Sequence, residues 1–86
     1  MAVRYTRHAL EKFELLAQHG FPITRQQVEG TVLHPERVES QSADRYMAQT
    51  AITPRHLLRV IYRIEGSDQV VITFYPGRRQ RYEGPI

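Results

Sequence analysis

Two residues near the N-terminus, His8 and Lys12, carry groups that could move protons around a phosphate ester. They stand four positions apart, so on a helix their side chains point the same way, one turn apart. An imidazole exchanges protons near neutral pH, and a lysine ammonium beside it could hold a phosphate. The alternative is a boundary histidine beside a solvated lysine, and these two residues alone leave both interpretations open.

Arginine dominates the basic residues of the chain. Lys12 is its single lysine among 12 Lys and Arg residues, and the planar guanidinium matches the geometry of phosphate oxygens. Arg59 and Arg63 share one face of a predicted strand, and Thr73 and Tyr75 share one face of the next. If these strands are neighbours, the four side chains form a phosphate-binding surface. The alternative is that the arginine stems only cover apolar surface.

The C-terminal arginines, Arg78, Arg79 and Arg81, lie between Tyr75 and Tyr82 in the sequence. Arginine mixed with aromatic rings is typical of surfaces that stack unpaired bases. We therefore expect these arginines, Tyr82 and Arg63 to bind RNA. The alternative is a solvated terminal segment without a ligand.

Composition narrows the class of protein. A chain of 86 residues with a formal charge of +3 and a pI near 9.7 predicts one basic domain, residues 1–86. Cysteine is absent, and the four histidines are not spaced as metal ligands, so we expect no metal site. No phosphate-loop or dinucleotide fingerprint is present, so we expect no cofactor. No apolar run approaches the ~20 residues that cross a bilayer, and Met1–Thr6 lacks the apolar core of a signal peptide. These features predict a cytoplasmic protein without a membrane partner.

The hydrophobic pattern predicts an α+β fold. Helices are expected first, with Thr6 and Thr24 as their N-caps, and strands joined by short turns are expected to follow as an antiparallel meander. We expect two N-terminal helices packed on one face of a curved sheet of three or four antiparallel strands. The expected helices span residues 7–19 and 24–33, and the expected strands span residues 37–41, 45–53, 57–65 and 69–75. A Pro-Gly turn is expected at residues 76–77.

Alternation along the last two strands predicts which side chains face the helices. The apolar rows expected there are Leu58, Val60, Tyr62, Ile64 and Val70, Ile72, Phe74. The opposite rows, which hold Arg59, Arg63, Thr73 and Tyr75, should form an open face. Arg37 is expected to lie away from that face.

Five motifs, in order along the chain, resemble the domain-of-unknown-function family 4258. Residues 5–13 (YTRHALEKF) are similar to its opening S/T-x-H-A-x-x-R-M, with Lys12 in place of arginine and Phe13 in place of methionine. Residues 20–28 (GFPITRQQV) are similar to R-G-I-S-x-x-D-V, and residues 34–36 (HPE) to N-P-E. Residues 58–62 (LRVIY) and 71–76 (VITFYP) are similar to L-R-V-V-Y and V-I-T-V-Y-P. The resemblance covers nearly the whole chain.

That family in turn resembles the bacterial toxins of the RelE, ParE and BrnT types. The resemblance implies a toxin that cleaves RNA or ribosome-bound mRNA and is inhibited by a small acidic antitoxin. It also implies His8, Lys12, Arg59, Thr73 and Tyr75 as catalytic residues. Two other functions stay open: a non-catalytic module that binds a protein partner, and a plain RNA-binding domain.

Overall fold

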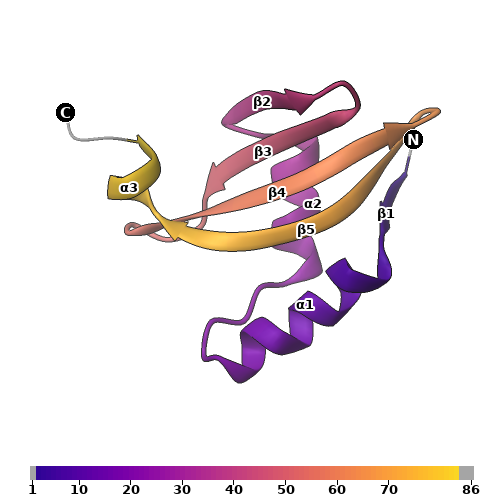
Figure 1. Ribbon diagram of the computed structural model, residues 1–86. Coiled ribbons are helices and arrows are strands. Elements are labelled where there is room, and N and C mark those ends of the chain that lie inside the picture. The colour runs from indigo at the N-terminus through magenta and orange to yellow at the C-terminus, as the bar shows by residue number, and fades with distance from the viewer. Residues whose placement is uncertain (1, 84–86) are drawn as a thin grey trace.

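A five-stranded sheet forms the centre of the protein (Figure 1), and a computed structural model describes residues 2–83. The strands lie in the order β1-β5-β4-β3-β2. The elements are β1 (Val3–Tyr5), α1 (Arg7–Gln18), α2 (Arg25–Leu33), β2 (Arg37–Ser42), β3 (Arg45–Ala51), β4 (His56–Glu65), β5 (Asp68–Arg78) and α3 (Arg79–Glu83).

The predicted sheet of three or four antiparallel strands beneath two helices is wrong. The sheet has five strands and is mixed, because β1 runs parallel to β5 while β2 to β5 pair antiparallel. A third helix, α3, follows β5. The 3 residues of β1 are too few for an alternating pattern to show. Pairing with a strand from the far end of the chain decides their structure.

Both longer helices begin at the threonines that the sequence indicates. The Thr6 hydroxyl accepts a hydrogen bond from the Ala9 N–H, and Thr24 forms a capping box with Gln27. After α1 the chain turns at Gly20, whose φ of +83° suits glycine. The residue types at the helix ends were therefore sufficient to predict where these helices begin.

A β-bulge in β5 overturns the predicted face for the first half of that strand, whereas Phe74 lies in the core as predicted. Ile61 pairs with Thr73 and Tyr62 pairs with Val71, so Ile72 is an extra residue without a partner on β4. The alternation shifts by one at this point, which places Val71 beside Phe74 in the core. Val70 is buried outside that cluster and Ile72 is only partly buried. A pattern of period two cannot reveal an inserted residue.

The core lies between the sheet and the two longer helices. In Figure 1, α2 crosses one face of the sheet and α1 runs beside β5; α2 packs on β3 and β4, and α1 on β5 and β1. Leu58, Val60 and Tyr62 face this core as predicted, whereas Ile64 at the end of β4 is exposed. The buried members of the core are Ala9, Ile23, Val28, Val32, Ala48, Leu58, Val60, Tyr62, Val71 and Phe74.

The predicted turn at Pro76-Gly77 is also wrong, because β5 continues to Arg78. The chain then turns into α3, which packs back on β5. Gly77 makes this possible, since a Cβ at this position would overlap the ring of Tyr82. As a result, Tyr82 lies over β5 and next to Arg59, whose guanidinium carbon is 4.3 Å from the centre of its ring.

Candidate functional site

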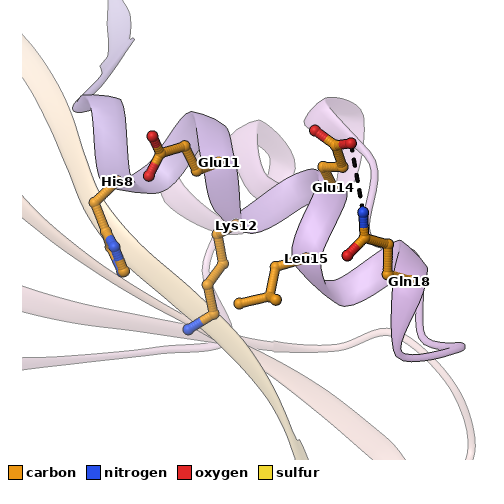
Figure 2. Close-up of a pocket in the computed structure, with 6 residues that line it drawn as sticks. All are labelled: His8, Glu11, Lys12, Glu14, Leu15 and Gln18. Carbon is orange, nitrogen blue, oxygen red and sulfur yellow. Dashed lines mark hydrogen bonds between the residues drawn. The ribbon is translucent and has the colours of Figure 1, made fainter.

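His8 and Lys12 converge on one hydroxyl of β5. The His8 Nε2 lies 3.2 Å from the Thr73 Oγ1, and the Lys12 Nζ donates to the same oxygen at 3.4 Å. Figure 2 shows both side chains directed toward the strand, while Glu14 points away from it. A surface hollow of about 380 Å³ runs along this part of α1, lined by His8, Glu11, Lys12, Glu14, Leu15 and Gln18. An imidazole, an ammonium and a hydroxyl therefore share one accessible place.

Thr6 fixes the start of α1 against the bulge and so sets this geometry. Its N–H donates to the Val71 carbonyl at 3.0 Å, and its hydroxyl donates to the Ile72 carbonyl at 3.1 Å. The same hydroxyl accepts the Ala9 N–H at 3.2 Å as the N-cap. Because His8 follows two residues after Thr6, this anchor holds the imidazole beside Thr73.

Arg59 lies on the open face between two tyrosine rings. Its guanidinium carbon is 5.9 Å from the ring centre of Tyr75 and 4.3 Å from that of Tyr82, within the range of cation–π attraction. Its Nε is buried and has no hydrogen-bond partner among the described residues. Buried polar groups usually have a hydrogen-bond partner. The two rings contact the Arg59 guanidinium but accept no hydrogen bond from Nε, so this N–H remains available to a ligand.

Cross-strand pairing connects these two groups of side chains. Arg59 pairs with Tyr75, and Ile61 pairs with Thr73. The five residues predicted as catalytic therefore lie on two adjacent rows of β4 and β5 and on the facing edge of α1.

Arg37 belongs to the same surface, contrary to the expectation that it lies elsewhere. It pairs with Gln49, which pairs with Arg59, so the three side chains form one row on the open face. Arg37 also forms an ion pair with Glu39 on its own strand. Because β2 pairs with β3 in this register, Arg37 faces the same side of the sheet as Gln49 and Arg59.

Arg63 lies apart from the other predicted site residues. Its Nε is 2.5 Å from the Glu65 carboxylate, which also binds Arg4 at 2.9 Å. Hydrogen bonds from Arg63 and then Arg4 are the main causes that hold the pKa of Glu65 below its usual value. Because its pairing partner on β5 is Val70, on the far side of the bulge, Arg63 belongs to this ion cluster and not to the surface around Thr73.

The C-terminal arginines meet two residues that the sequence analysis did not single out, Arg55 and His56. The Arg79 N–H donates to the Arg55 carbonyl at 2.9 Å, and His56 pairs with Arg78 across the sheet. They border a hollow of about 350 Å³, lined by Pro54, Arg55, His56, Arg78, Arg79 and Gln80. Arg81 lines an adjoining hollow with Tyr82. The sequence did contain one indication of their role, since both residues lie next to a turn and directly before a predicted strand.

Thr53 fixes the tautomer of His56. The Thr53 hydroxyl oxygen accepts the N–H groups of Arg55 and His56, at 3.2 and 2.9 Å. Its own proton is then free to point at the His56 Nδ1, 3.1 Å away. The Nδ1 acts as the acceptor, so the proton of the neutral ring resides on Nε2. His56 thus adds a donor to a basic hollow.

Searches for similar proteins give no further information on the site. No family model, no curated protein and no solved structure matches the chain. Within residues 2–83, no group of three or more His, Cys, Asp or Glu side chains is placed to hold a metal ion. Over the same residues, no helix combines the length and the apolar character needed to cross a membrane.

Proposed function

We propose that this protein is a toxin-type endoribonuclease that works without a metal ion. The observation that carries the proposal is the convergence of His8 and Lys12 on the Thr73 hydroxyl, one row from Arg59 and Tyr75. These are the group types that RNA cleavage by its own 2′-hydroxyl requires. The motif resemblance to family 4258 points to the same class.

In the proposed reaction, the RNA 2′-oxygen attacks the adjacent phosphorus and the 5′-oxygen leaves. His8 transfers a proton, either from the 2′-hydroxyl or to the leaving oxygen. Lys12 and Arg59 stabilise the charge that grows on the phosphate oxygens. Thr73 positions the phosphate through its hydroxyl. When His8 accepts the 2′-hydroxyl proton, Tyr75 donates a proton to the leaving 5′-oxygen. When His8 is the donor to that oxygen, Tyr75 stacks on a base and a water molecule accepts the 2′-hydroxyl proton.

Substrate binding is proposed to extend from this centre to the basic end of the sheet. Arg55, Arg78, Arg79 and Arg81 gather there with His56, around two adjoining hollows. Positive side chains attract the phosphates of an RNA strand or of ribosome-bound mRNA. Tyr82 supplies a ring for stacking. A small acidic antitoxin is the complementary inhibitor for such a surface.

A plain RNA-binding domain is the second candidate. The observation that favours it is the position of Arg59 beside Tyr75 and Tyr82. A guanidinium next to aromatic rings suits a phosphate and a stacked base, and this arrangement does not involve His8. This function predicts RNA affinity with no cleavage. The two candidate functions therefore differ in whether cleaved RNA is produced.

The deciding experiment is expression in bacteria with growth and RNA integrity followed together, then cleavage assays on purified protein with and without ribosomes. His8→Ala and Arg59→Ala should each reduce cleavage by about 10²–10⁴-fold. The matched control is Arg7→Ala, since Arg7 precedes His8 on the same helix and its side chain is 93% exposed. Melting temperatures verify folding.

Full activity of folded His8→Ala and Arg59→Ala proteins would refute the catalytic assignment. RNA binding without cleavage by the wild-type protein would establish the second candidate. Absence of both would leave a protein-binding module as the function.

A further inference from the structure

The outer edge of β2 is the open edge of the sheet. β2 is the last strand in the order, and over residues 2–83 no other strand pairs with its outer side. The strand at the opposite edge, β1, has only 3 residues, and the part of β5 beyond it contains Pro76, which has no N–H. Short edge strands and prolines both make the addition of another strand unfavourable. β2 contains no proline. It is therefore the edge at which another strand can add.

The charges of β2 are complementary to themselves. Arg37 and Glu39 lie on the same face of the strand and form an ion pair with each other. In an antiparallel pair of two β2 strands related by a two-fold axis at Val38, Arg37 of each copy lies opposite Glu39 of the other. Axes at Arg37 or Glu39 would place like charges opposite each other, which is unfavourable. Of these three registers, only the one with its axis at Val38 places opposite charges across the interface.

Apolar surface supports the same arrangement. Val38 and Leu33 are 46% and 45% exposed, so both apolar side chains contact water in the single chain. Val38 pairs with Ala48, a member of the core, so its side chain lies on the face that α2 covers. Leu33 ends α2 just before β2 begins. In the proposed pair, Val38 meets Val38 of the second copy and both are withdrawn from water.

We propose that two copies of this chain associate through β2 in this antiparallel register, joining two five-stranded sheets into one of ten strands. The inference is independent of the proposed ribonuclease function. The surfaces around Thr73 lie on β5, three strands away from β2, so they stay open at the two outer ends of the dimer. One dimer then presents two identical sites.

The test is a charge-exchange series measured by sedimentation and light scattering over a wide range of protein concentration. Wild-type protein should show the mass of two chains and dissociate on dilution. Arg37→Glu and Glu39→Arg should each weaken self-association on the order of tenfold or more. The double variant R37E/E39R should restore it. Arg7→Glu, an equal change of charge on α1, should have no effect.

Mixing the two single variants gives the sharpest result. One variant has two glutamates at these positions and the other has two arginines. The mixture should therefore form a heterodimer at a protein concentration at which each variant alone is monomeric. A wild-type mass of one chain at every concentration overturns the proposal. Self-association of unchanged affinity in either single variant also overturns it, as does a mixture that associates no more tightly than the single variants. Equal melting temperatures confirm that the variants are folded.

Discussion

At the scale of single residues, the Thr73 hydroxyl is the centre of the candidate site. Thr73→Val removes this oxygen and keeps the shape of the side chain. We expect RNA cleavage to fall at least tenfold, because His8 and Lys12 lose their shared partner and the phosphate loses a positioning group. Binding of a non-cleavable RNA should change little. Unchanged cleavage by a folded Thr73→Val protein would show that this hydroxyl only orders the helix.

Gly77 and Tyr82 provide a second test at this scale. Gly77→Ala places a methyl group where the Tyr82 ring lies, and we expect it to cost about 1–3 kcal/mol of stability and to displace the ring from Arg59. Tyr82→Ala removes the ring directly. Both variants should lose similar RNA affinity, and the double variant should be no worse than either. Additive losses, measured by titration with labelled RNA, would mean that the two residues act separately.

At the scale of elements, the bulge decides which face of β5 is buried. Phe74→Ala should cost about 3–5 kcal/mol of unfolding free energy because it empties a packed core position. Ile72→Ala, in the same strand but outside the core cluster, should cost clearly less. Denaturant titrations of the two variants test the assignment. A larger loss at Ile72 would contradict the register with the bulge.

Tyr5 connects β1 to α2, and this link depends on pH. Its hydroxyl donates to the Glu29 carboxylate at 2.6 Å, and burial first, then this bond, raises the pKa of Tyr5. A raised pKa gives stability that is present below about pH 10, the ordinary value, and is lost as the pH rises above it. Tyr5→Phe should be less stable than wild type at neutral pH and lose less stability in alkali. Parallel curves of unfolding free energy against pH would contradict this.

Residue types next to each other in the sequence were enough to predict the two longer helices of this fold. Pairing between distant segments determines the remaining elements. The capping residues Thr6 and Thr24 act within their own turn, so both helices could be placed from the sequence. β1 and α3 owe their structure to contacts with β5, which no local pattern contains. His8, Lys12, Arg59, Thr73 and Tyr75 were predicted as a group through the motif resemblance, and they lie close together. Arg55 and His56 were missed because only the folded chain brings them to the C-terminal arginines.

At the scale of the whole molecule, positive charge should control RNA binding. Affinity should fall with salt as counterions return to the phosphates. Replacing Arg78, Arg79 and Arg81 by glutamine should reduce the slope of log affinity against log salt by about 2, since each contact with a single strand contributes about 0.7. The same triple variant should remain folded. An unchanged slope would remove the basic end of the sheet from the binding surface.

The parallel pairing of β1 with β5 has a consequence for the order of events during synthesis. The Ala2 N–H binds Asp68, which is 66 residues further along the chain, and a ribosome delivers the N-terminal end first. His8 and Lys12 therefore leave the ribosome long before Thr73 exists. The complete site can form only when nearly the whole chain is free to close this long loop. A nascent chain that ends before Thr73 therefore lacks the candidate site, and under the proposed function it should cleave no RNA.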